Sequence, residues 1–357
     1  MNLYFIFIIV LALFGIEFCF KGGNKEYLSK TNTSCIKGIF ILIVFYSHFT
    51  QYTHVNMSKD FLMYDLRIFL GQLMVTLFLF YSGFGIFESI KNKKNYVKSM
   101  PKNRIFKTWF HFAIAVLAFL ILAIILGNQD LSIKRILLSF TGWKHVGNSN
   151  WYMFAIICLY ITSFLSFTIF NKKEDYKKAI ILNYVITIGL ILFLSVYKEF
   201  YCYNTLLCYN LGMSFSYHKK EIESKLFDYK KYIILLGLTA LAFYTLRQLK
   251  GINFWYFEIY SMVFSLLVVE LSVLVNLKSK ALKWFGDKLF WFYILQRIPM
   301  IILAEIGLAS HPYRFALLAF VGTIILTIVF DFSTKKIDKL IFREKKTKNN
   351  GRKLCAE

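Results

Sequence analysis

The sequence predicts an all-α fold: a polytopic helix bundle, integral to a membrane, with about 11 transmembrane helices. Three observations support this prediction. The chain of 357 residues is 57% hydrophobic and 19% aromatic, which is too apolar for an ordinary soluble domain. Its apolar runs have the length that a helix needs to cross a bilayer, roughly 17 to 25 residues. Its basic residues alternate in number between the segments that follow successive runs.

Eleven apolar runs are long enough to be predicted as spans. The weakest is the run at 200–217, because asparagine and hydroxyl side chains dilute it. The predicted spans are residues 2–20, 35–53, 67–88, 108–127, 151–170, 178–196, 200–217, 232–246, 254–276, 289–308 and 314–331.

The net charge of +23 follows the membrane rather than a nucleic-acid surface. Of the 43 Lys and Arg residues, 32 lie in segments after odd-numbered spans and 9 in segments after even-numbered spans, while Lys37 and Arg297 lie inside spans. Basic residues concentrate in the cytoplasmic loops of membrane proteins. We therefore expect the N-terminus outside, the C-terminus in the cytoplasm and no nucleic-acid partner.

We expect structural rather than catalytic roles for the two ends of the chain and for the cysteines. Residues 1–34 are expected to form an N-terminal transmembrane helix and a cytoplasmic loop, because the first apolar run lacks the basic start and the cleavage site of a signal peptide. Residues 332–357 are expected to form a basic cytoplasmic tail. The six cysteines stand at irregular spacings, mostly inside spans, and indicate neither a disulfide framework nor a metal site.

The second span contains an ionisable residue deep in an apolar run, CIKGIFILIVFYSHFTQY, residues 35–52. Lys37 and His48 are eleven residues apart, which on a helix is about 16 Å of rise and three turns plus about 20°, so both side chains share one face. An ionisable group at that depth costs free energy unless it faces protein or water, and it is therefore a candidate for function. The structural alternative is a neutral histidine that is hydrogen-bonded between helices.

Five pieces of the sequence, in order, resemble the acyltransferase-3 family of membrane acyltransferases. They are Lys37-Gly38 through His48, TLFLFYSGFGIFES with Ser82-Gly83, KNRIFKTWF with the basic pair Arg104 and Lys107, SNWYMFAIICLY at the next outer membrane edge, and FGDKLFWFYILQRIPM. The resemblance covers residues 35–331, which are then a ten-helix acyltransferase domain, and leaves the first helix as an addition.

The resemblance implies an O-acyltransferase of the bacterial polysaccharide type in the plasma membrane. Its donor substrate is a cytosolic acyl-CoA, usually acetyl-CoA, with no permanently bound cofactor, and its acceptor is a hydroxyl of an extracytoplasmic or lipid-linked glycan. His48 is the expected general base, because imidazole takes up a proton near neutral pH. The residues expected to contact the donor are Lys37, Arg104, Lys107, Tyr293 and Gln296, and those expected to contact the acceptor are Asn150 and Trp151.

Each of these residues also has a structural interpretation. The basic pair enforces topology and contacts anionic lipid, Lys37 extends along the helix to the interface, and Trp151 is an interface anchor. Ser82-Gly83 lets two helices approach closely, which is the interpretation that we favour there. Tyr293 and Gln296 line a donor tunnel or form hydrogen bonds between helices. The acidic residues inside spans are expected to face polar partners, with Glu270 a candidate to orient His48, and they are Glu17, Glu258, Glu270 and Glu305.

The chain departs from the family pattern, and two other classes of protein compete with it. Arginine is commoner in the family at Lys37 and Lys107, and many relatives carry histidine at Gln296; lysine does not replace arginine where a bidentate contact is needed. A transporter or flippase of a lipid-linked saccharide uses intramembrane charges as a substrate path, but inverted repeats are not evident here. An unrelated family of membrane O-acyltransferases also uses one buried histidine, and the lysine and glycine before His48 argue against it.

Overall fold

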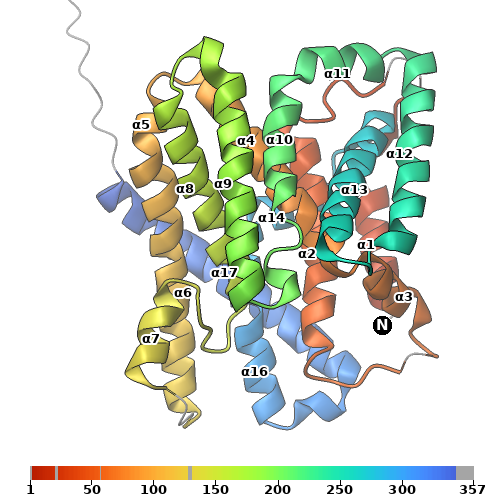
Figure 1. Ribbon diagram of the computed structural model, residues 1–357. Coiled ribbons are helices and arrows are strands. Elements are labelled where there is room, and N and C mark those ends of the chain that lie inside the picture. Colours follow the sequence, from red (N-terminus) through yellow and green to blue (C-terminus); the bar gives the residue numbers. More distant parts are fainter. Residues whose placement is uncertain (1, 21–22, 57, 128–130, 343–357) are drawn as a thin grey trace, which may run out of the picture.

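The structure is a bundle of long helices (Figure 1). It is a computed structural model that describes residues 2–20, 23–56, 58–127 and 131–342. Within these ranges, eight helical segments are long and apolar enough to cross a membrane, and they coincide with eight of the eleven predicted spans. The prediction of a polytopic all-α membrane protein is therefore confirmed. The segments are Lys30–Phe49, Phe61–Asn92, Tyr96–Ile125, Trp151–Ile169, Lys173–Tyr197, Tyr229–Leu249, Phe254–Leu274 and Pro312–Ile341.

Several segments contain more than one helix. In chain order, the helices as far as α8 are α1 (Asn2–Leu13), α2 (Lys30–Phe49), α3 (Phe61–Leu70), η1 (Gly71–Val75), α4 (Thr76–Asn92), α5 (Tyr96–Met100), the π-helical η2 (Pro101–Phe106), α6 (Lys107–Ile125), α7 (Ile133–Phe140) and α8 (Trp151–Ile169). They are followed by η3 (Lys173–Asp175), α9 (Tyr176–Tyr197), η4 (Phe200–Cys202), α10 (Leu207–Tyr217), α11 (Lys219–Leu226), α12 (Tyr229–Leu249), α13 (Phe254–Leu274), α14 (Lys280–Asp287), α15 (Leu289–Leu295), α16 (Arg297–Glu305), η5 (Leu308–Ser310) and α17 (Pro312–Ile341). The last helix therefore continues ten residues beyond the predicted boundary at 331.

The first predicted span, 2–20, is wrong as a single helix. α1 has 12 residues and is about 18 Å long, which is shorter than the hydrocarbon core of about 30 Å. Gly15, with a φ of +89°, follows the helix, and the chain then forms strand β1 (Ile16–Phe18). β1 pairs antiparallel with β2 (Val275–Leu277), so its backbone groups have partners from a distant part of the sequence.

The predicted span at 200–217 contains only a half-length helix, α10, of 11 residues. The first backbone N–H groups of such a helix need acceptors, and no water is available for them inside a bilayer. The acceptors here belong to Glu258 on α13, which is fully buried. Its two carboxylate oxygens accept hydrogen bonds from the N–H groups of Leu206 (3.1 Å) and Leu207 (3.2 Å). The predicted polar partner of Glu258 is therefore the N-terminus of α10.

The predicted span at 289–308 is divided into α15 and α16 at Gln296. Pro299 has no N–H to donate to the carbonyl group of Leu295 four residues earlier, and its ring crowds that carbonyl group. The helix therefore breaks where the predicted donor-binding residues Tyr293 and Gln296 lie.

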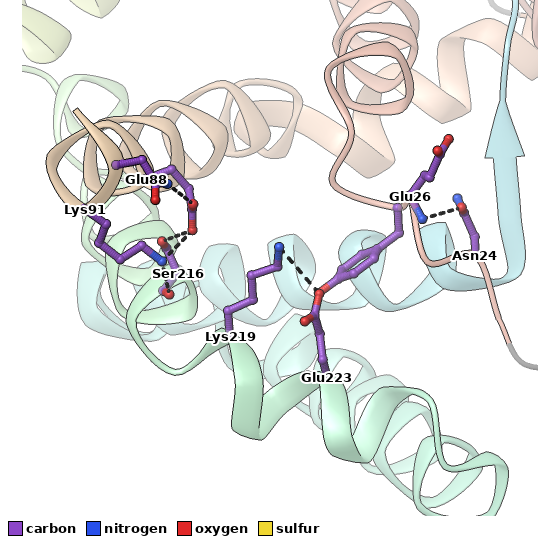
Figure 2. Close-up of polar contacts among 9 residues, drawn as sticks. Asn24, Glu26, Glu88, Lys91, Ser216, Lys219 and Glu223 are labelled. Atoms are coloured by element: carbon purple, nitrogen blue, oxygen red, sulfur yellow. Dashed lines mark hydrogen bonds and ion pairs between the residues drawn. The ribbon is translucent and has the colours of Figure 1, made fainter. Parts of the chain in front are cut away.

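The ends of the bundle differ in charge. We call the loops and short elements at residues 23–29, 91–107, 170–175, 218–228 and 275–288 the basic end, and those at 50–60, 131–150, 198–206, 250–253 and 306–311 the opposite end; in Figure 1, α5 and α11 mark the first and α7 and α16 the second. The ion pairs between described residues gather at the basic end, where carboxylates offset many of the lysines. In Figure 2, for example, Glu88 Oε1 accepts hydrogen bonds from Lys91 Nζ (2.6 Å) and from the Ser216 hydroxyl (2.6 Å). Lys219 Nζ forms an ion pair with Glu223 Oε1 (3.6 Å).

Two helix pairs in the core approach closely enough for backbone contact. A Cβ atom at Gly38 of α2 would lie 2.1 Å from the carbonyl oxygen of Leu282 in α14, and one at Gly286 of α14 would lie 1.9 Å from that of Ser34 in α2. α4 and α10 are related in the same way through Gly83 and Gly212. These contacts place α2 and α4 in the buried centre of the bundle, and they confirm the packing interpretation of Gly83.

We expect Gly38→Ala and Gly212→Ala to destabilise the protein, because the new methyl group meets backbone that cannot rotate away. Overpacking of this kind costs about 1–3 kcal/mol or more. Thermal unfolding in detergent measures the effect. Gly189→Ala in α9 and Gly237→Ala in α12 are matched controls, since a Cβ atom at either position meets nothing within 4 Å. Equal unfolding temperatures for all four variants would contradict the close contact.

Candidate active site

His48 lies in the last turn of α2, beside the break between α15 and α16. Its imidazole ring is 6.0 Å from the ring of Tyr293, centroid to centroid, and Gln296 lies beside it. Three buried polar atoms at this place, His48 Nδ1, the Tyr293 hydroxyl and Gln296 Oε1, form no hydrogen bond of good geometry among the described residues, although Gln296 lies beside the imidazole and Ser149 beside the Tyr293 hydroxyl. Buried polar groups are normally paired, so unpaired atoms gathered at one point suit a site where a ligand or water supplies the partners.

The helix break sets the orientation of these groups. Gln296 is fully buried and donates from Nε2 to the carbonyl oxygen of Tyr293 (2.8 Å), a group in the last turn of α15. This bond holds the side-chain amide and leaves its Oε1 directed elsewhere. Tyr293 and Gln296 were predicted to line a donor tunnel or to form hydrogen bonds between helices. The structure places both beside His48, and the bond from Gln296 joins it to the preceding turn.

Arg297 is the residue at this place to which we assigned no role from the sequence. Its guanidinium group donates to Ser149 Oγ (2.7 Å), to the Tyr52 hydroxyl (3.1 Å) and to Gln51 Oε1 (2.6 Å). It therefore ties the end of α2 to the segment just before α8, on the side of His48 nearer the opposite end. The sequence did indicate a role for Arg297, because a charged residue inside a transmembrane span raises the free energy unless it has polar partners.

The basic end has a cavity of about 470 Å³ that is lined by both members of the predicted basic pair, Arg104 and Lys107. These residues share one face because η2 and α6 continue the helix without interruption. Arg104 Nε donates to the Tyr96 hydroxyl (2.8 Å). A second cavity of about 820 Å³ shares Lys93, Lys94 and Tyr96 with the first, so the two are adjacent.

Lys107 and Lys37 differ from Arg104 in their surroundings. Lys107 forms an ion pair with Asp338 of α17 (2.8 Å), a carboxylate that also contacts His111 Nε2 (2.8 Å). Lys37 does not line the cavity of Arg104; its charged neighbours are Asp287 and Lys30. The structure thus brings two of the predicted donor cations to one cavity and leaves the third, Lys37, in the N-terminal half of α2.

A row of hydroxyl side chains connects Arg104 with His48. Tyr160 of α8 is a neighbour of Arg104, and Ser82 of α4 lies beside the hydroxyl groups of both Tyr160 and Tyr152. The Tyr152 ring is 5.5 Å from that of Tyr293, which in turn contacts the ring of His48. In this structure the buried rings of Tyr152 and Tyr293 separate the basic-end cavities from the imidazole.

The predicted acceptor residues line a cavity of about 650 Å³ at the opposite end. Asn150 Nδ2 donates to the carbonyl oxygen of Gly142 (2.5 Å), so its amide fixes the loop before α8. The Trp151 ring lies 6.1 Å from that of Tyr201, and Tyr201 is in turn a neighbour of Tyr293. This cavity therefore adjoins the His48 site through Tyr201 and Tyr293.

The remaining acidic residues lie away from the histidine. Glu270 accepts from the Thr239 hydroxyl of α12 (3.0 Å), so the prediction that it orients His48 finds no support in the geometry. Glu17 pairs with Lys278 (2.7 Å) at the basic end. Glu305 ends α16 and is exposed.

Comparison with known proteins identifies one family. The acyltransferase-3 model, described as an acyltransferase domain, matches residues 32–332. No curated protein and no solved structure matches the chain.

The ion pair between Lys107 and Asp338 can be tested for its contribution to the stability of the protein. We expect a double-mutant cycle of Lys107→Met and Asp338→Asn, followed by thermal unfolding, to show coupling of about 1 kcal/mol, since the pair is partly exposed. Lys102→Met, on the exposed side of η2, is the control and should not couple to Asp338→Asn. Absence of coupling for Lys107 would leave its charge available to a ligand.

Proposed function

Because this chain belongs to the acyltransferase-3 family and is a membrane acyltransferase, we propose that it moves an acetyl group from acetyl-CoA to a hydroxyl of a glycan, with His48 as the general base. The observation that supports this most strongly is the position of His48. The imidazole lies between a basic cavity at one end of the bundle and an aromatic cavity at the other, and Tyr160, Ser82, Tyr152 and Tyr293 lie in turn between Arg104 and the imidazole.

The basic end suits the donor. Coenzyme A carries phosphate groups, and guanidinium and ammonium groups bind phosphate through charge-assisted hydrogen bonds. Arg104, Lys93 and Lys94 line the cavity there. With the phosphates held at this end, the extended arm of coenzyme A reaches along the row of hydroxyl groups, and its thioester meets His48. Tyr152 and Tyr293 move aside to admit the thioester, because their rings lie on this path.

The chemical step needs a base and a donor for the oxyanion. The acceptor hydroxyl oxygen attacks the thioester carbonyl carbon while His48 takes the hydroxyl proton. The unpaired Tyr293 hydroxyl donates to the carbonyl oxygen as negative charge develops there. When the C–S bond breaks, the thiolate leaves and takes the proton from the imidazolium, which restores His48 and releases the ester and free coenzyme A.

The sidedness follows from the distribution of charge. The segments of the basic end hold 17 lysines and arginines and those of the opposite end hold 6, and we therefore assign the basic end to the cytoplasm of a bacterial plasma membrane, with the N-terminus outside and the C-terminus inside. In this orientation the donor comes from the cytosol, and the acceptor is an extracytoplasmic or lipid-linked glycan at the opposite end.

Replacement of the imidazole tests the catalytic role. We expect His48→Ala to lower acetyl transfer by about 10²- to 10⁴-fold, the usual contribution of a general base. Labelled acetyl-CoA is supplied to membrane vesicles, and label in the glycan fraction is counted. His54→Ala, an exposed histidine six residues further along the chain, is the matched control and should retain full transfer.

Three outcomes of this assay have different meanings. Loss of transfer in His48→Ala alone supports the base. Equal transfer in both variants removes the catalytic role of His48. No transfer in the wild type, together with movement of a lipid-linked saccharide across the vesicle membrane, favours the flippase.

Replacement of Arg104 tests the donor site. We expect Arg104→Ala to raise the KM for acetyl-CoA about tenfold or more, because a hydrogen bond to a charged group contributes about 1.5–3 kcal/mol. The KM for the acceptor should not change. Lys177→Ala, an exposed lysine in the first turn of α9, controls for the loss of one positive charge at the same end. A change in the acceptor KM alone would place the donor elsewhere.

A further inference from the structure

The cavity at the opposite end is lined by aromatic and by basic side chains, the two kinds that can contact the sugar rings and the acidic groups of an anionic glycan. Trp151 and Tyr201 contribute aromatic rings, Lys134 and Lys144 contribute ammonium groups, and Lys198 lies against the ring of Trp143. The cavity lies between the loop before α8 and the end of α9, and its volume of about 650 Å³ is enough for a short oligosaccharide segment.

The positive charge of this cavity is unusual for its place. In the orientation proposed above, the opposite end is extracytoplasmic, and only 9 of the 43 lysines and arginines of the sequence lie in the segments that follow the even-numbered predicted spans, which face that side. Four of these nine, Lys134, Arg135, Lys144 and Lys198, line this one cavity. They come from two segments that are more than fifty residues apart in the sequence, and the fold brings them together.

The charge of these lysines is not offset as it is at the basic end. Among the described residues, Lys134, Lys144 and Lys198 form no ion pair with a carboxylate, and the acidic residue that lines the cavity is Glu199, which is exposed. Lys198 is held over the Trp143 ring, 3.8 Å from its centroid, and donates to the Trp143 carbonyl oxygen. One lysine is thus fixed against an aromatic face, and the other two are exposed.

The positive charge around the cavity affects the pKa of His145, which lies in the same loop. Partial burial, together with the charges of Arg135, Arg297, Lys144 and Lys198, holds the pKa of His145 below its usual range. An excess of positive charge around a cavity attracts anions and raises their local concentration.

We propose that this cavity binds an anionic segment of the acceptor, a glycan that carries carboxylate or phosphate groups, with sugar rings on Trp151 and Tyr201 and the anion at Lys134, Lys144 and Lys198. This inference rests on the proposed transfer to a glycan and names the class of that glycan. Since Tyr201 neighbours Tyr293, a hydroxyl next to the bound segment is directed toward His48.

Binding to the purified full-length protein in detergent, measured by calorimetry, tests this without any acetyl transfer. The probes are a uronic-acid oligosaccharide, the neutral oligosaccharide of the same length and a glycosyl phosphate. We expect the acidic oligosaccharide to bind at least tenfold more tightly than the neutral one and to weaken as salt is raised. Binding of the glycosyl phosphate in its place also supports the inference and assigns the charge to the phosphate of a carrier lipid.

The variant Lys134→Gln with Lys144→Gln removes two exposed charges and should therefore fold. We expect it to raise the Kd of the anionic probe about tenfold or more and to leave the KM for acetyl-CoA unchanged. Lys59→Gln, at the same end but outside the cavity, is the control and should bind as the wild type does.

Two results would overturn the inference. One is equal affinity for the acidic and the neutral oligosaccharide, and the other is an unchanged Kd in the double variant. If, in either case, His48-dependent acetylation of a neutral glycan persists, the proposed function stands and only the class of acceptor is wrong.

Discussion

The backbone contact between α2 and α14 is the interaction on which the site depends. Gly38 and Gly286 remove the side chains that would keep these helices apart, so the backbone of each helix rests on a carbonyl group of the other. Because hydrophobic burial gives little drive for association between helices inside lipid, such close packing carries much of the attraction. The glycine after Lys37 therefore fixes α2 in the centre of the bundle, and the position of α2 brings His48 to the break between α15 and α16.

The long helices were predictable because their apolar runs are long and their flanking charges alternate. Prediction failed where a polar group inside a run has a local structural purpose that hydropathy does not express. Gly15 ends α1 early, and β1 finds its partner 257 residues further along the chain, which no local pattern reveals. Glu258 shortens the seventh predicted span to a half-helix by serving as the acceptor at its N-terminus. Pro299 was visible in the sequence, but the position of the break at Gln296 depends on how α15 and α16 pack.

The candidate site was partly predictable for similar reasons. His48, Tyr293 and Gln296 are conspicuous as polar groups inside apolar runs, and the structure brings them together. The pairing of Lys107 with Asp338 joins helices that are distant in sequence, so spacing alone left it unseen. Arg297 was visible as a charge within a span, but its partners Gln51 and Ser149 come from two other segments. The roles of these residues in transfer remain predictions.

The pairing of β1 with β2 has a consequence for how the chain assembles during synthesis. α1 is made long before residues 275–277, yet the strand that follows it acquires its hydrogen-bonding partner only when those residues have left the ribosome. Until then α1 is secured mainly by nearby contacts, such as the bond from the Tyr4 hydroxyl to the Leu42 carbonyl oxygen (2.9 Å). The segment that precedes α2 is thus fixed only after α2 through α13 have been made, and the closing of this small sheet follows the synthesis of most of the bundle.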